Sequence, residues 1–179
     1  PDILSFLDEH HYTVAAYVLT HGHVDHVSGL AEMVAARPAP VAMHPRDARW
    51  AFTRRGAMPP YYDTPKAPPA IDRNLAEGQS WTDAGLTYTI IDTPGHSPGG
   101  VAFYFADAGI LISGDSLFRG SIGRSDLPGA SPTELAVSLK KLMALPETTV
   151  VYSGHGPATT IGEEKRHNPY LQSFDWATA

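Results

Sequence analysis

A dense cluster of histidine and aspartate side chains near the start of the chain has the composition of a metal site. The cluster consists of His21, His23, Asp25 and His26, and it directly follows an apolar segment, residues 14–19, that has the length of a buried strand. A turn after a strand can aim alternate side chains to two sides. His21 and His23 would then face one metal ion, while Asp25 and His26 face another. Neutral imidazole and carboxylate groups are suitable ligands for Zn²⁺, Fe²⁺ or Mn²⁺. The alternative, a solvated histidine-rich loop, is disfavoured because the cluster is so dense.

Three more residues of ligand type occur later in one recurring context. His96 lies in Thr-Pro-Gly-His-Ser-Pro-Gly-Gly, Asp115 in Ser-Gly-Asp-Ser and His155 in Ser-Gly-His-Gly-Pro. Each follows an apolar strand-like segment and a glycine, which lets the backbone approach a crowded site. Alone, each could be a turn or capping residue. Together with the first cluster, they predict one convergent metal site.

The remaining histidines lack this context. We interpret His10, His11 and His167 as surface residues. His44 ends a short apolar segment before Pro45 and could lie near the site, but a structural role is favoured.

Strand-like and helix-like segments alternate along the chain and predict a mixed sheet rather than a doubly wound parallel one. The helices are expected at residues 1–11, 30–36, 46–52, 132–145 and 163–174. The strands are expected at residues 14–19, 41–44, 86–92, 101–105, 110–113 and 150–153. Ser131 and Glu134 have capping-box spacing at the start of the fourth helix.

Residues 54–74 contain five prolines and two adjacent tyrosines, which predicts a long surface loop. Loops of this length are usually functional or disordered, so the loop either overhangs a site or is a variable insertion.

The overall composition limits the classes of function. The 179 residues predict a single domain, 1–179, and 42% apolar residues are enough for a hydrophobic core. A formal net charge of −6 argues against a nucleic-acid binder, and the absence of cysteine excludes disulfides, thiolate ligands and a cysteine nucleophile. We see no membrane-spanning run and no signal peptide, so the cytoplasm is the expected location.

The motifs Thr-His-Gly-His-Val-Asp-His, Gly-His-Ser-Pro-Gly, Ser-Gly-Asp-Ser-Leu-Phe and Ser-Gly-His-Gly-Pro, in this order, resemble the metallo-β-lactamase superfamily. Within it the sequence is most similar to short bacterial glyoxalase II-like (hydroxyacylglutathione hydrolase-like) enzymes. The resemblance implies an α/β fold with mixed sheets, the αββα sandwich. It also implies that one metal is bound by His21, His23 and His96, that a second is bound by Asp25, His26 and His155, and that Asp115 bridges them.

The implied function is a dinuclear metal-dependent hydrolase that carries two zinc ions, or alternatively iron or manganese. A metal-bound hydroxide would attack a thioester or ester carbonyl. Asp25 could also handle a proton, and Thr20, Ser97 and Ser116 could orient the ligands.

The substrate is expected to be a small molecule, such as a glutathione thioester. Arg124, and more weakly Arg119, match places where relatives hold a glutathione carboxylate, although either could be a plain surface arginine. The helical domain that follows in true glyoxalase II is not part of this sequence. The family's N-terminal β-hairpin is missing as well, so we expect N-terminal strands to be absent from this chain.

Three other functions remain open at this stage. The sequence also resembles persulfide dioxygenases, which bind one iron through residues that match His21, His96 and Asp115. Lactonase or β-lactamase activity is a further alternative. A non-catalytic binding module would be expected to have lost a metal ligand, and none of the seven is lost.

Overall fold

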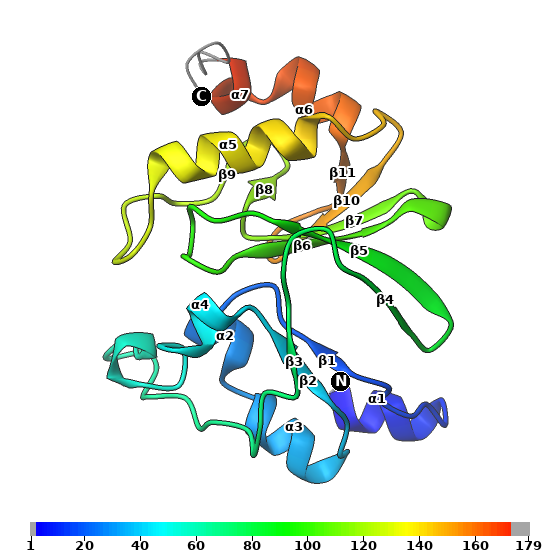
Figure 1. Cartoon of the computed structure of the whole chain (residues 1–179), viewed down its shortest axis with the longest axis vertical. Helices are drawn as coiled ribbons and strands as arrows, with labels where there is room; N and C mark the ends of the chain where they lie inside the picture. Colours follow the sequence, from blue (N-terminus) through cyan, green and yellow to red (C-terminus); the bar gives the residue numbers. More distant parts are fainter. Residues whose placement is uncertain (1–2, 173–179) are drawn as a thin grey trace.

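Two β-sheets lie in the middle of the molecule with helices on their outer sides (Figure 1). The computed structural model describes residues 3–172. The helices are α1 (Ile3–Glu9), α2 (Val24–Val27), α3 (Leu30–Ala36), α4 (Pro45–Ala48), α5 (Pro132–Met143), α6 (Ile161–His167) and α7 (Pro169–Gln172), with 3-10 turns η1 (Arg54–Gly56) and η2 (Ala106–Ala108). The strands are β1 (Tyr17–Val18), β2 (Val41–Met43), β3 (Arg73–Asn74), β4 (Ser80–Asp83), β5 (Leu86–Asp92), β6 (Val101–Phe105), β7 (Ile110–Gly114), β8 (Leu117–Phe118), β9 (Ser121–Ile122), β10 (Val150–Ser153) and β11 (Thr159–Thr160).

The larger sheet has six strands in the order β11-β10-β7-β6-β5-β4. β7 and β10 pair in parallel, and the other neighbours are antiparallel. Strands β5, β7 and β10 therefore run in the same direction and end at the same edge of the sheet. A second sheet contains the parallel strands β1, β2 and β3, and β8 pairs with β9 separately. The predicted mixed α/β architecture of the αββα sandwich is thus confirmed.

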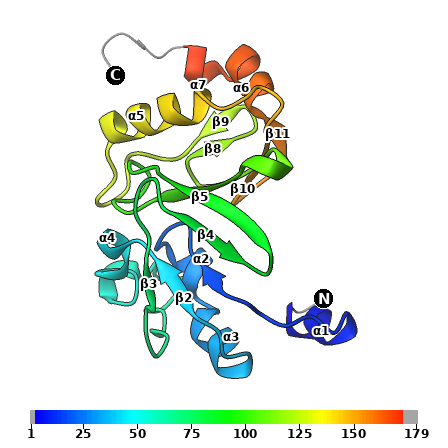
Figure 2. The same ribbon diagram turned by 45° about the vertical axis from the view of Figure 1, so that its right-hand side comes forward.

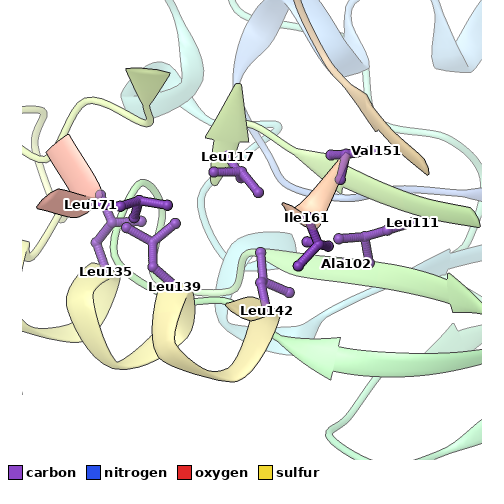
Figure 3. Close-up of a cluster of buried hydrophobic side chains, with 9 residues drawn as sticks. All are labelled: Ala102, Leu111, Leu117, Leu135, Leu139, Leu142, Val151, Ile161 and Leu171. Carbon is purple, nitrogen blue, oxygen red and sulfur yellow. The ribbon is translucent and has the colours of Figure 1, made fainter. Parts of the chain in front are cut away.

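Leucines of α5 cover the outer face of the six-stranded sheet (Figure 3). Leu135, Leu139 and Leu142 are fully buried at helical spacing, so they form one continuous apolar face. They belong to one cluster with side chains of the sheet such as Leu111 and Val151. Burial of this face, rather than helix propensity alone, stabilises α5 against the sheet.

A second apolar cluster contains residues from both sheets. Ala42 of β2 contributes from the small sheet, while Tyr88, Ile90 and Phe103 contribute from the large one. Two smaller clusters pack helices against β2 of the small sheet: Val27 of α2 lies in one, and Leu30 and Val34 of α3 lie in the other. The two sheets therefore hold each other in a defined orientation.

Several predicted elements are confirmed at their boundaries. Residues 30–36, 86–92, 101–105 and 150–153 form the elements expected of them. The Oγ of Ser131 accepts a hydrogen bond from the Glu134 backbone N–H at 3.2 Å, as predicted for the cap of α5. The Ser131 N–H instead donates to the carbonyl of Gly95, which joins this helix to the loop that carries His96.

Other predictions of elements were wrong or incomplete. The polar loop after residue 19 already turns into the helix α2 at Val24. The helix expected at 46–52 is a single turn, α4, and the loop 54–74 ends in β3, which pairs with β2. The last helix breaks between α6 and α7, because Pro169 lacks an N–H and disfavours helix at Asn168. Its expected end at residues 173–174 lies outside the described residues.

The short strands β4, β8, β9 and β11 were missed, since segments of two to four residues carry little periodicity. The first strand is also shorter than expected, with only Tyr17–Val18 paired. The first helix, α1, stands apart from the sheets at the end of an extended segment (Figure 2). None of its residues is fully buried, and it contacts the body through an ion pair of Asp8 with Arg37.

Between residues 3 and 172, none of the helices is both long enough and apolar enough to cross a membrane.

Truncation of Leu139 tests the packing of α5. We expect Leu139→Ala to lower the free energy of unfolding by about 2–5 kcal/mol, because it leaves a cavity between the helix and the sheet. Val137→Ala on the same helix is the control, since Val137 is 42% exposed and its loss removes little buried surface. Denaturant unfolding monitored by circular dichroism gives both values. Equal effects of the two substitutions would contradict this packing.

Candidate metal centre

The strand ends bring the seven predicted ligands together. His96, Asp115 and His155 follow β5, β7 and β10, the three strands that end at one edge of the large sheet. His21 and His23 come from the loop after β1, and the backbone N–H of Val101 in β6 donates to Thr20 O at 2.8 Å. That bond ties the first ligand loop to the same edge of the large sheet.

Three groups of side chains in this centre are close enough to hold metal ions. The ligand atoms of His21, His23 and His96 all lie within 4.8 Å of one another. Those of Asp25, His26 and His155 do so as well. A third group, His21, His26 and Asp115, overlaps both trios. A cluster of two trios with a shared carboxylate fits a dinuclear metal site.

Asp115 lies between the two trios. Its Oδ2 is 3.6 Å from Nε2 of His96 and 3.5 Å from Nε2 of His155, while its Oδ1 is 3.4 Å from Nε2 of His26. The carboxylate therefore faces histidines from both trios. Within the second trio, Nε2 of His155 is 3.1 Å from Oδ2 of Asp25.

Electrostatics favour the neutral imidazole, the form that binds metal, at His21 and His23, but act in the opposite direction on His26. Burial, followed by the charges of neighbouring imidazoles, lowers the pKa of His21 well below its ordinary value. Burial and His96 together lower the pKa of His23 to about 4. Burial acts against a charge on His26, yet the hydrogen bond and charge of Asp115 outweigh it and raise the pKa of His26. The pKa of Asp115 falls because these contacts outweigh its own burial, so Asp115 is ionised at neutral pH.

His21 shows the pattern of a metal-binding histidine. Its Nδ1 contacts the hydroxyl of Thr20 at 3.1 Å, which orients the ring. Its Nε2 is buried and has no hydrogen-bond partner within residues 3–172. A buried nitrogen without a partner is costly, and a metal ion in the centre would satisfy it. The residues present thus fit a metal.

Groups around the predicted ligands orient them. Nδ1 of His96 contacts the backbone carbonyl of Arg124 at 2.9 Å, so this arginine supports the centre through its main chain. Of the three orienting residues expected, Thr20 contacts a ligand directly. Ser97 donates to Asp47 instead, and the main-chain carbonyl of Ser116 accepts from Gly123.

Asp47 is a site residue that the sequence analysis missed. Its fully buried carboxylate accepts from the Gly22 N–H at 2.8 Å, from the Ser97 hydroxyl at 2.7 Å and from the Gly99 N–H at 2.6 Å. Gly22 lies between His21 and His23, and Ser97 follows His96. One carboxylate therefore joins the two segments that carry the first trio. The neighbouring His44 has the structural role predicted for it, because its ring accepts from the Arg46 N–H and caps α4.

The substrate arginines predicted from the sequence lie on the surface. Arg119 is exposed, and the guanidinium of Arg124 makes two 3.0 Å bonds to the carboxylate of Asp126. Their proposed contact with a substrate carboxylate stays a prediction. Buried Glu164 stabilises the turn that carries Arg119, because its carboxylate accepts a hydrogen bond from the Gly120 N–H at 2.9 Å.

Comparison with known proteins assigns the chain to a family. Residues 12–155 match the family model of the metallo-beta-lactamase superfamily, and the chain belongs to this superfamily.

Relatives and solved structures agree with this assignment. The chain is 39% identical to a probable metallo-hydrolase, YqgX, of Bacillus subtilis, over 96% of this chain and 82% of that protein. It is 30% identical, with the same coverage, to hydroxyacylglutathione hydrolase GloC of Haemophilus influenzae. The BLEG-1 B3 metallo-beta-lactamase structure matches with 38% identity and a TM-score of 0.88, covering 96% of this chain and 83% of that one. A di-iron-bound form of TTHA1623 matches with 43% identity and a TM-score of 0.86, covering 94% and 83%.

Replacing Asp47 tests its role in joining the ligand loops. We expect Asp47→Asn to weaken metal affinity by about 10–100-fold, because loss of the charge loosens both loops. Asp83→Asn is the control: Asp83 is also paired, with Arg73 at 2.8 Å and Tyr88 at 2.7 Å, but it lies in β4. Competition with a chromophoric chelator measures affinity. Unchanged affinity in a folded Asp47→Asn protein would refute the role.

A methyl group added at Gly154 is expected to close the second half of the centre. A Cβ there would lie 2.1 Å from Oδ1 of Asp115 and 2.7 Å from Cε1 of His26. We therefore expect Gly154→Ala to bind fewer than two metals per chain, as measured by elemental analysis. Gly29→Ala is the matched control, because a Cβ at Gly29 meets nothing within 4 Å. Two metals per chain in Gly154→Ala would contradict this prediction and show that the backbone at residue 154 shifts to accommodate the methyl group.

Proposed function

We propose that this protein is a hydrolase of thioesters or esters that uses two metal ions, with zinc as the expected metal. The observation that carries the proposal is the pair of ligand trios on either side of Asp115. Membership of the metallo-beta-lactamase superfamily and the similarity to a probable metallo-hydrolase support the class of enzyme.

In this proposal each trio binds one metal ion. His21, His23 and His96 would hold the first ion, the trio Asp25, His26 and His155 would hold the second, and Asp115 would contact both. Bound there, two divalent cations supply Lewis acidity, which lowers the pKa of a water and polarises the carbonyl of the substrate.

The protein's own groups would orient this centre and handle protons. Thr20 fixes the ring of His21, the Arg124 carbonyl fixes His96, and Asp47 holds the loops of both. The Asp25 side chain keeps 31% of its surface exposed, so this carboxylate would lie at the solvent side of the centre, where a proton could be handed to water.

The relatives suggest which carbonyl compounds to test first. The similarity to GloC supports a thioester, and S-lactoylglutathione is therefore the first substrate. The similarity to BLEG-1 supports β-lactams as a second candidate class, to be tested with a chromogenic cephalosporin.

The mononuclear dioxygenase alternative would use three of the same residues, His21, His96 and Asp115. Oδ2 of Asp115 lies 3.6 Å from Nε2 of His96, and His21 belongs to a ligand group with each of them, so metal content rather than ligand geometry distinguishes the two functions. The di-iron form of TTHA1623 shows that iron in a similar protein does not imply a single metal ion.

Metal content and turnover test the proposed function together. We expect about two zinc ions per chain and hydrolysis of S-lactoylglutathione or another thioester. Loss of a group that only supports a metal ligand typically lowers activity by roughly 10–100-fold. We expect a larger loss of kcat/KM in His23→Ala and in Asp115→Asn, because each substitution removes a metal ligand itself. His167→Ala is the control, since His167 is an exposed histidine of α6.

Two outcomes would contradict the proposal. Unchanged turnover in folded His23→Ala and Asp115→Asn would show that the centre does not catalyse the reaction. One iron per chain together with oxygen uptake on a persulfide would support the dioxygenase instead.

A further inference from the structure

A cavity of about 530 Å³ opens beside the first trio of the metal centre. Its wall is formed by His23 and Val24, Trp50, residues 55–58, Pro98 and residues 127–129. His23 thus belongs both to the predicted metal centre and to this cavity. The volume lies within the range of small-molecule sites. Residues 55–58 of the predicted loop 54–74 line this cavity, and the interpretation that the loop overhangs a functional site stays a prediction.

The wall of this cavity is largely apolar. Trp50, Met58 and Leu127 supply the larger side chains, and prolines and small residues supply most of the rest. The Trp50 ring lies 5.5 Å from the His23 ring, and its Nε1 donates to Oδ1 of Asp47 at 3.2 Å. Because the polar atom of the indole is already paired, Trp50 presents an apolar surface next to the centre. Such a wall favours an apolar group of a ligand.

Arg55 is the one residue of this wall with a permanent charge. Its side chain is exposed and makes no hydrogen bond or ion pair with another residue in the part of the chain that the structure describes. Arg124, by contrast, is paired with Asp126, and Arg73 is paired with Asp83. Because Arg55 belongs to the cavity wall and its guanidinium has no partner, it is suited to bind a carboxylate at the cavity through two hydrogen bonds.

We propose that the substrate carries an apolar arm that ends in a carboxylate, with the arm in this cavity and the carboxylate on Arg55. The inference rests on the proposed function, because it places the scissile carbonyl of that arm at the metal centre. It differs from a glutathione arm, whose peptide groups, ammonium and two carboxylates would meet mostly apolar side chains here.

Two matched thioesters test this inference on the metal-loaded protein. They share the neutral thiol N-acetylcysteamine and differ in the acyl group, hexanoyl or its ω-carboxylated counterpart 5-carboxypentanoyl. Because a hydrogen bond to a charged group strengthens binding about tenfold or more, we expect kcat/KM to favour the carboxylated thioester by about tenfold. Arg55→Gln should bring this ratio close to one, mainly through KM. Arg54→Gln, at the neighbouring exposed arginine outside the cavity wall, should keep the ratio.

A ratio near one in the unmodified protein, or a ratio unchanged by Arg55→Gln, would overturn the inference. If neither thioester is hydrolysed, the result counts against the proposed function. Binding of ligands then tests whether Arg55 holds a carboxylate at the cavity. We expect calorimetry to show that 4-phenylbutyrate binds about tenfold more tightly than its neutral amide and that Arg55→Gln removes this difference. Preference for the carboxylate that persists in Arg55→Gln would place the anion on the metal centre and overturn the role of Arg55.

Discussion

The fully buried carboxylate of Asp47 joins two segments of chain that are far apart in sequence and that both carry predicted metal ligands. A buried carboxylate is stable only when its oxygens are hydrogen-bonded. The hydrogen bonds that Asp47 accepts therefore fix the positions of Gly22, Ser97 and Gly99. The same group binds the Trp50 indole, which lines the cavity beside the centre. One interaction thus couples the shape of the metal centre to the shape of the adjoining cavity.

The rest of the centre depends on the direction of strands. Because β5, β7 and β10 run the same way, the segments that follow them emerge at one edge of the sheet and bring His96, Asp115 and His155 together. Rigid strand ends hold ligands more exactly than mobile loops do. The loop that carries His21 comes from the small sheet. The apolar cluster between the two sheets fixes the distance between this loop and the strand ends of the large sheet.

Sequence patterns recovered the elements in which apolar residues are periodic or continuous over several residues. The strand at 86–92 and the helix that begins after Ser131 show such periodicity, the strand at 101–105 is a continuous apolar run, and all three were predicted. The short strands β8, β9 and β11 owe their existence to partners elsewhere in the chain. Two residues acquire a strand conformation only when another segment supplies their hydrogen bonds, and this information is not local.

For the site, the sequence by itself determined the residue types and their setting: histidines and aspartates that follow glycines at strand ends, together with the superfamily that these motifs indicate. The tertiary structure alone decided which other groups surround them. Asp47 has no motif around it, and only the packing of α4 against the loops of His21 and His96 reveals its function. Arg124 matched a substrate position by its local motif, yet its guanidinium pairs with Asp126 while Arg55 reaches the cavity. Local sequence encodes the chemistry that a residue can perform, whereas the neighbours that a side chain meets depend on contacts between segments distant along the chain.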